Sequence, residues 1–195
     1  MRTSNLFVCA GALAGVAACG GGSAKPATIP GDGTVYPVPA LPGEVTCWHG
    51  TGGVEFVTGQ EQGQIDMYVR RGYDAGAGTV TEDALSVVKG AASRSWQTLA
   101  IDGGALTVAG KYKGGTFSGT GSAEGAAPAW SRWVVDTTLD VGPQVHSEYT
   151  AQGAGLEAVS VVADGNGNAM MRFTVQLAAM DLASCDAAYS HVEPL

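Results

Sequence analysis

Apolar and polar residues alternate with a period of two along most of the chain after Gly43. In the clearest case, Ile65, Met67 and Val69 lie on one side of an extended segment and polar residues lie on the other. Such alternation is typical of half-buried β-strands. Similar strands are predicted at 44–49, 54–58, 95–101, 105–112, 116–120, 133–141, 145–149, 159–163 and 171–179. The segment 81–88 leaves two alternatives open, a short helix capped by Thr81 or another strand.

Glycine-rich turns separate these segments. Residues 102–104 (Asp-Gly-Gly) and 113–115 (Lys-Gly-Gly) predict a three-strand meander, and residues 164–168 (Asp-Gly-Asn-Gly-Asn) predict a hairpin. In the predicted strand at 133–141, one face is shared by Trp133, Val135, Thr137, Leu139 and Val141. In the last strand, the inward face is expected to hold Met171, Phe173, Val175, Leu177 and Ala179.

The spacing of strands and turns predicts an all-β fold, an antiparallel sandwich or small closed barrel of about nine strands with at most one short helix. The 30 glycines, with Thr and Val between them, favour the same class. An open row of antiparallel strands has two free edges. A link between Cys47 in the first strand and Cys185 just after the last would bring these edges together, which favours a closed or nearly closed architecture.

Size and charge narrow the classes of function. A chain of 195 residues can form one domain with a substantial core but not two comfortable ones. The formal net charge is −8 and only 14% of the residues are charged. The densest basic pairs are Arg70-Arg71 and Lys111 with Lys113. Because phosphate binding requires clustered Lys and Arg, we expect no nucleic-acid partner.

The N-terminus has the pattern of a bacterial export signal. Arg2 precedes an uncharged apolar run, residues 6–16, that is too short to span a bilayer as a helix but fits a signal-peptide core. Residues 16–19, Val-Ala-Ala-Cys, resemble the lipobox of bacterial lipoproteins, with Val16 where leucine is most common. The resemblance implies cleavage before Cys19, lipidation of its sulfur, and anchoring of an extracytoplasmic domain to a bacterial membrane of the cell envelope.

Three parts of the chain follow from this prediction. Residues 1–18 are expected to be the lipoprotein signal peptide, and residues 19–42, rich in glycine and proline, a flexible tether. Residues 43–195 are expected to form the β-domain, held to the membrane through the lipid on Cys19.

The remaining cysteines, Cys47 and Cys185, are an even pair in an extracytoplasmic domain, where disulfides form and persist. They are therefore predicted to form a disulfide. One alternative is a zinc site in which both thiolates join His49 and His191, although the spacing fits structural zinc poorly. A second alternative is a thiol nucleophile formed by Cys47 with His49, which an oxidising envelope disfavours.

The folded part resembles the mycobacterial 19 kDa lipoprotein antigen family. The shared features are the lipobox, the tether, a cysteine in the first strand and one after the last, and a Gly-Thr strand at residues 116–121. The span between the cysteines is longer here, with additional residues around 126–155. The resemblance implies a surface-exposed protein without enzymatic activity.

Motifs for catalysis are absent from the sequence. It contains no G-x-S-x-G, P-loop, H-E-x-x-H or C-x-x-C motif, and no cofactor or catalytic residue is predicted. Residues 164–168 imitate the start of a calcium loop, but Ala169 and Val175 stand where an EF-hand needs glycine and glutamate. The tryptophans Trp48, Trp96, Trp130 and Trp133 are expected mainly to fill a core.

The sequence thus predicts a lipid-anchored lipoprotein of the cell envelope that is not an enzyme. Its domain is expected to be a binding, surface-presentation or structural module, with a protein or small-molecule partner that the sequence does not identify. The alternative is a carrier of a small apolar ligand or lipid inside a β-barrel. A pocket lined by Met67, Phe173 and Leu177 would favour the carrier, and a core filled by side chains would favour the module.

Overall fold

A computed structural model describes residues 33–57 and 62–195 of the chain. Within these ranges the chain forms ten strands and a single short helix, α1 (Leu182–Tyr189). The strands are β1 (Glu44–Phe56), β2 (Gln62–Asp74), β3 (Thr79–Val88), β4 (Ala91–Asp102), β5 (Ala105–Tyr112), β6 (Gly115–Glu124), β7 (Arg132–Leu139), β8 (Gln144–Gln152), β9 (Gly155–Ala163) and β10 (Ala169–Met180). The predicted all-β class with at most one short helix is confirmed.

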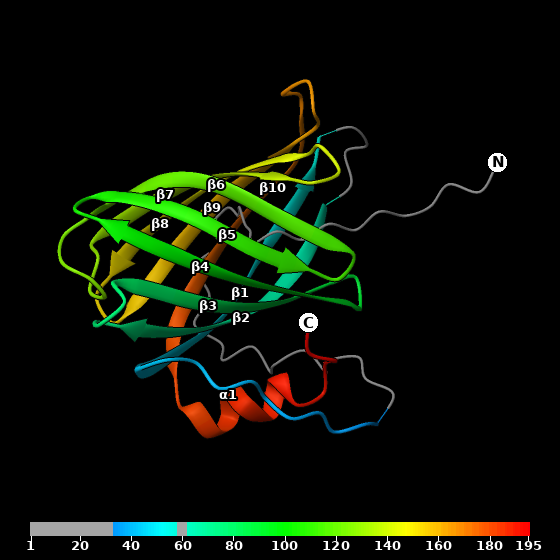
Figure 1. Cartoon of the computed structure of the whole chain (residues 1–195). Helices are drawn as coiled ribbons and strands as arrows, with labels where there is room; N and C mark the ends of the chain where they lie inside the picture. The colour runs from blue at the N-terminus through cyan, green and yellow to red at the C-terminus, as the bar shows by residue number, and fades with distance from the viewer. Residues whose placement is uncertain (1–32, 58–61) are drawn as a thin grey trace.

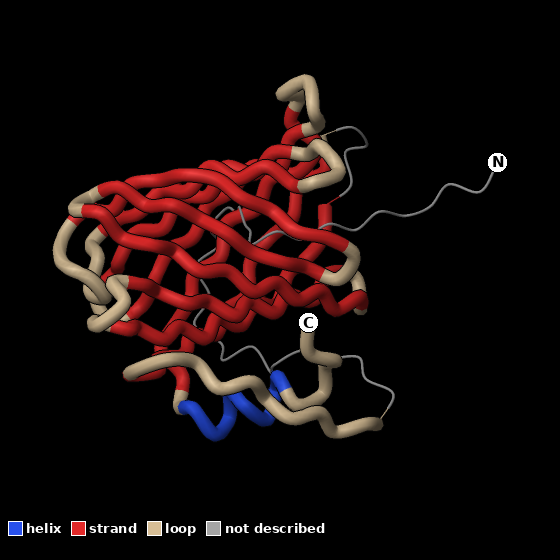
Figure 2. Tube along the Cα trace, in the orientation of Figure 1, coloured by secondary structure: helices blue, strands red, loops and turns tan. Residues whose placement is uncertain are grey.

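The strands form a closed antiparallel barrel in which each strand pairs with the next along the chain (Figures 1 and 2). The barrel closes where β1 pairs with β10, so that Cys47 lies opposite Arg70 of β2 on one side and Met180 of β10 on the other. Of the two predicted architectures, the closed barrel is therefore the one that forms. The closure gives the first and last strands partners on both sides.

Two segments differ in detail from the sequence prediction. The predicted strand at 44–49 and residues 54–56 of the predicted strand at 54–58 are parts of the single strand β1, which runs through Gly50, Gly52 and Gly53 without a break. The ambiguous segment 81–88 lies in strand β3, and the helix forms instead after β10. Both outcomes reflect pairing with neighbouring strands, which outweighs weak local preference.

Glycines at two opposite positions flatten the barrel. A Cβ atom at Gly50 of β1 would lie 1.9 Å from the carbonyl oxygen of Gln176, and one at Gly119 of β6 would lie 1.9 Å from that of Asp136. Such close approach of neighbouring backbones marks a sharp bend of the wall. At these bends β10 comes close to β2 across β1, and β5 comes close to β7 across β6. These two bends, at β1 and β6, lie half-way round the closed barrel from each other.

The flattened interior holds one cluster of buried apolar side chains to which all ten strands contribute. One member from each strand, in chain order, is Val54, Ile65, Val80, Leu99, Leu106, Phe117, Trp133, Val145, Leu156 and Phe173. Each of these residues occupies an inward-facing position, and inward-facing and outward-facing positions alternate along a strand, as the sequence pattern predicts.

The predicted inward faces need two corrections at their ends. Val141 is 55% exposed because β7 ends at Leu139, where the Asp140 carboxylate accepts a hydrogen bond from the Thr116 backbone N–H and fixes the turn. Ala179 is exposed because it lies near the end of β10, beyond the residues that pair with β9.

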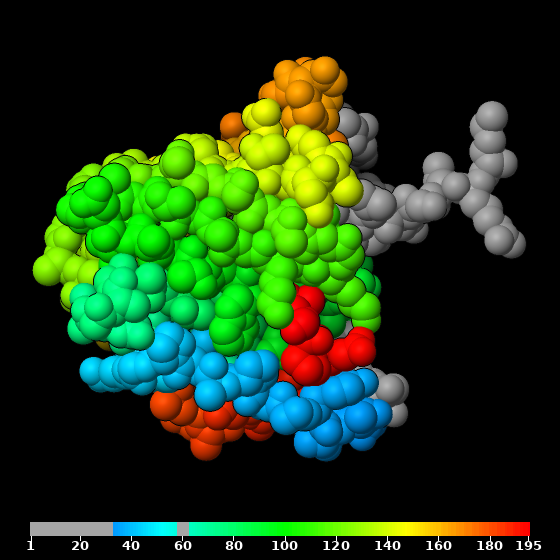
Figure 3. Space-filling view, viewed as in Figure 1, coloured from blue at the N-terminus to red at the C-terminus, as the bar shows by residue number. Residues whose placement is uncertain are grey.

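Helix α1 and the segment before β1 pack against the outside of the barrel wall (Figure 1). They cover a second cluster formed by Cys47, Tyr68, Leu85, Cys185 and Tyr189. Figure 3 shows the N-terminal residues from 33 onward, in blue, next to the C-terminal residues, in red, along this face. None of the helices in the described part of the chain is both long enough and apolar enough to cross a bilayer.

Candidate functional site

Two adjacent arginines on β2 face two adjacent acids on β3 through the wall of the barrel. Strand register places Arg70 opposite Asp83 and Arg71 opposite Glu82. Because successive residues of a strand point to opposite faces, the Arg70 pair lies outside the wall and the Arg71 pair lies inside. One hairpin therefore builds two separate buried ion pairs.

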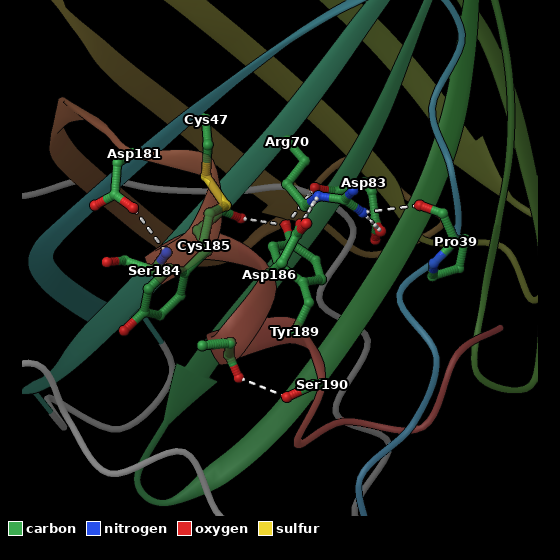
Figure 4. A network of polar contacts seen from close by, with 12 residues as sticks. Pro39, Cys47, Arg70, Asp83, Asp181, Ser184, Cys185, Asp186, Tyr189 and Ser190 are labelled. Atoms are coloured by element: carbon green, nitrogen blue, oxygen red, sulfur yellow. Dashed lines mark hydrogen bonds and ion pairs between the residues drawn. A yellow bond between two sulfur atoms is a disulfide. The ribbon is translucent and has the colours of Figure 1, made fainter.

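The outer charge network consists of Arg70, Asp83 and Arg94. Figure 4 shows Arg70 and Asp83 close to Asp186 and Tyr189 of the helix. Asp83 is fully buried and accepts two hydrogen bonds from Arg94, from Nε at 2.9 Å and from Nη2 at 2.7 Å. Arg70 Nη1 lies 3.4 Å from the same carboxylate, and Arg70 Nε lies 3.0 Å from Asp186 of α1. The network thus ties β2, β3 and β4 to the helix.

Tyr189, the last residue of α1, is inserted between the two arginines. The Arg70 and Arg94 guanidinium carbons lie 5.3 and 5.0 Å from its ring centroid. Its hydroxyl points at the carbonyl oxygens of Tyr68 and Asp83. Burial, and next the charge of Asp83, raise the pKa of this hydroxyl well above its usual value, so Tyr189 acts as a neutral donor.

A disulfide between Cys47 and Cys185, with a Cα–Cα distance of 6.5 Å, joins β1 to α1 and confirms the predicted pairing. The helix begins after Asp181, whose carboxylate accepts from the Ser184 N–H at 2.9 Å. This hydrogen bond lowers the pKa of the Asp181 carboxyl. A helix of one to two turns is unstable alone, so its position depends on the disulfide and on Tyr189.

The segment before β1 is held in the same assembly. The Tyr36 N–H donates to the Ser190 carbonyl at 2.8 Å, and Arg70 Nη1 donates to the Pro39 carbonyl at 3.1 Å. These contacts extend the folded unit toward the N-terminus to at least Tyr36, within the residues assigned to the tether. We call the disulfide, α1, residues 36–41 and the outer charge network the clasp.

The alternatives that needed free thiols do not fit this geometry, since both sulfurs are bonded to each other. His49 Nε2 lies 2.5 Å from Asp66 Oδ1, and its ring stacks on Tyr68 with 4.3 Å between centroids. Within the described ranges no group of three or more His, Cys, Asp or Glu side chains is arranged to hold a metal ion.

The inner ion pair lies in an aromatic environment. Arg71 donates from Nε to Glu82 Oε1 at 2.8 Å, and Gln97 donates to the other carboxylate oxygen. The Arg71 guanidinium carbon lies 4.1 Å from the Trp133 ring centroid, 5.3 Å from that of Trp48 and 5.7 Å from that of Trp130. We call Arg71, Glu82 and the three tryptophans the inner cage.

Tyr149 extends the inner cage by stacking on Trp133. The two rings are parallel within 6°, with centroids 4.7 Å apart. Burial, and next the Glu82 carboxylate, raise the pKa of the Tyr149 hydroxyl above its usual value. Among the residues that the structure describes, the Trp133 Nε1–H is buried and has no hydrogen-bond partner. The inner cage therefore combines aromatic faces, a neutralised charge pair and one unused hydrogen-bond donor.

The predicted functional residues are distributed as follows. Cys19 and the lipobox lie outside the described residues. Trp130 and Trp133 are both buried in the core, Trp48 packs against it, and Trp96 lies half-buried on the outer face.

The motif at residues 164–168 forms the β9–β10 turn, as predicted. The Asp164 carboxylate accepts from the N–H groups of Asn166 and Asn168 at 2.8 and 2.9 Å. The Asp164 carboxylate therefore stabilises the turn through these hydrogen bonds.

Neither ion pair is predicted from the sequence. The available signal was the match between an Arg-Arg pair and a Glu-Asp pair in successive extended segments. This signal predicts the ion pairs only when β3 is known to be a strand and its register with β2 is known. The local sequence pattern determines neither of these. Comparison of the chain with known protein families and with curated protein sequences finds no match in either.

Proposed function

We propose that the protein is a lipid-anchored lipoprotein of the cell envelope whose barrel is a non-catalytic binding or presentation module. The observation that carries this proposal is the filling of the barrel. Met67, Phe173 and Leu177 are 1%, 1% and 3% exposed and belong to a single packed core. A solid barrel is suited to display its outer surface and loops.

The alternative function is a carrier of a small apolar ligand, with which a closed ten-stranded barrel is compatible. Such a carrier would bind its ligand against Met67, Phe173 and Leu177. These side chains are instead buried within the single core cluster that fills the barrel. The packing supports the module over the carrier.

The anchor is proposed from the lipobox, and the disulfide supports it. Disulfides persist in oxidising compartments, which agrees with a domain outside the cytoplasm. In the producing cell, Cys19→Ala should abolish fatty-acid labelling and release the protein from membranes. Continued labelling of the variant would refute the anchor, and Cys47→Ser, which removes another cysteine, provides the matched control that should retain the label.

Native mass spectrometry of protein purified from its own membranes distinguishes the two functions. The module predicts a mass equal to that of the lipidated chain. A lipid or other apolar molecule that copurifies in stoichiometric amount would favour the carrier.

A further inference from the structure

The inner cage closes the end of the barrel at which β1 begins, and it differs in kind from the rest of the interior. The remainder of the interior core is built mainly of aliphatic and Phe side chains. The inner cage instead buries a salt bridge whose partners are each 3% exposed. Replacing a buried ion pair by apolar side chains commonly leaves a protein as stable or more stable. Packing alone therefore does not account for these charges.

One N–H donor of the inner cage is left without an acceptor. Within the part of the chain that the structure describes, Trp133 Nε1 is buried and unpartnered. The Arg71 guanidinium carbon lies 4.1 Å from the Trp133 ring centroid, and Arg71 donates from Nε and Nη2 to Glu82. Buried donors without partners are rare in folded proteins and call for an acceptor.

Trp130 covers this region from the loop between β6 and β7. Its ring is 4% exposed, whereas the neighbouring Ala126, Pro128 and Ala129 are exposed. The ring centroid lies 5.6 Å from that of Trp133, at an interplanar angle of 52°. Trp130 thus fills a place the size of one indole ring beside Arg71 and Trp133.

Among the described residues, the loop that carries Trp130 is hydrogen-bonded to the rest of the barrel only at its base. Ser131 donates from N and from Oγ to the Glu124 carbonyl, at 2.9 and 3.1 Å. Residues 126–130 form no hydrogen bond with any other described residue. Segments with few hydrogen bonds and exposed backbone open at low free-energy cost.

We propose that this end of the barrel is a binding site for a small, flat, uncharged ring that carries a hydrogen-bond acceptor, and that Trp130 is a displaceable plug occupying the site in the free protein. The ring replaces the Trp130 indole, and its acceptor takes the hydrogen bond from Trp133 Nε1. This site goes beyond the proposed function, which does not depend on it.

The charge of the site selects an uncharged ligand. Glu82 already neutralises Arg71, so an anionic ligand would bury a net negative charge beside the carboxylate. A cationic ligand would meet the guanidinium of Arg71. A carbonyl or amide oxygen satisfies the Trp133 Nε1–H donor without adding charge, and the tryptophan faces accept the ring.

The test uses three probes that differ in one group and the purified full-length chain in detergent. Indole-3-carboxamide is neutral with an acceptor, indole-3-carboxylate is anionic, and indole lacks the acceptor. Calorimetric titration compares the wild type with Trp130→Ala, and Trp96→Ala removes an outer tryptophan as the matched control. Removing the plug frees the site, so Trp130→Ala should bind the carboxamide at least about tenfold more tightly than the wild type. It should bind the carboxylate and indole less tightly than the carboxamide, and Trp96→Ala should behave as the wild type.

Nuclear magnetic resonance of the tryptophan indole groups gives a second readout in the wild type. The carboxamide should shift the Trp133 Nε1–H resonance, which is assigned by its loss in Trp133→Phe. The Trp133→Phe variant keeps an aromatic ring, but it should bind indole-3-carboxamide no more tightly than it binds indole.

Three results would overturn the proposal: a folded Trp130→Ala protein that binds no probe, equal affinity for carboxylate and carboxamide, or equal binding by Trp130→Ala and wild type. If Trp130→Ala does not fold, an unchanged Trp133 resonance in the wild type at millimolar carboxamide refutes it.

Discussion

Neutralising Asp83 tests whether the outer charge network holds the clasp to the barrel. The substitution Asp83→Asn keeps the shape of the side chain and removes its charge. Arg94 then loses its ion pair while it remains 3% exposed. Removing one member of a buried ion pair commonly costs about 3–5 kcal/mol, because the other charge is left uncompensated. Arg70 keeps Asp186 at 3.0 Å, which places the expected loss toward the lower value.

Urea unfolding of the oxidised protein, followed by circular dichroism, measures this loss. With a slope of about 2 kcal/mol per molar urea, a loss of about 3 kcal/mol lowers the midpoint by about 1.5 M. Glu148→Gln is the control, since Glu148 pairs with the exposed Arg132 on the outer wall and exposed pairs contribute little. Its midpoint should stay close to that of the wild type.

A double substitution separates lost charge from lost packing. In Asp83→Leu with Arg94→Met, both members of the pair are replaced by apolar side chains, so no uncompensated charge remains at Arg94. This protein should be more stable than Asp83→Asn. A midpoint for Asp83→Asn within about 0.3 M of the wild type, or a double variant less stable than the single one, would refute the reasoning.

Three further predictions concern the disulfide, the bends and the last hairpin. Replacing Cys47 and Cys185 by serine removes a bridge between residues 138 apart, so the free energy of unfolding should fall by about 5 kcal/mol. Urea unfolding measures this loss, and an unchanged midpoint would contradict the prediction. Gly119→Ala should unfold the barrel or lower its melting temperature strongly, because the added Cβ would lie 1.9 Å from a backbone oxygen. Gly63→Ala is the control and should be tolerated, since its Cβ would meet nothing nearer than 3.8 Å. Similar melting temperatures for the two variants would disprove the bend. Hydrogen bonds from Asn168 and Asn166 lower the pKa of the Asp164 carboxyl from 3.8 to about 2, so its contribution to stability is present above pH 4 and is lost as the pH falls toward 2. Asp164→Ala should therefore lose less thermal stability than the wild type over this pH interval. Identical pH profiles of the two proteins would exclude the effect.

The period-two pattern was sufficient to predict the fold class because it reports which side of each strand is buried. The hairpins from β4 to β6, with their Gly-Gly turns, were recognisable for the same local reason. The single strand β1 was divided in the prediction because Gly50 and Gly52 interrupt the apolar pattern. These glycines are required by the close approach of β10, a contact more than 120 residues away that no local pattern contains.

The candidate sites were less accessible from sequence than the fold. The Cys47–Cys185 bridge could be predicted, since compartment and cysteine count left one natural pairing. The inner cage could not, because Arg71 meets Trp130 only when the β6–β7 loop folds over the end of the barrel. Adjacent charges such as Glu82 and Asp83 acquire meaning only after the strand register sends them to opposite faces.

The pairing of β1 with β10 also has a consequence for refolding kinetics. Every other pairing in the barrel joins strands that are consecutive in the chain, so it forms with a short loop. The closing seam, in which Gly52 lies opposite Val175, must overcome the entropy of the longest loop and is expected to limit the rate. In the oxidised unfolded chain the disulfide already holds the two strands of this seam together at the end where Cys47 lies opposite Met180. Oxidised protein should therefore refold faster than reduced protein, and the trapping of free thiols over time would report the moment at which the barrel closes.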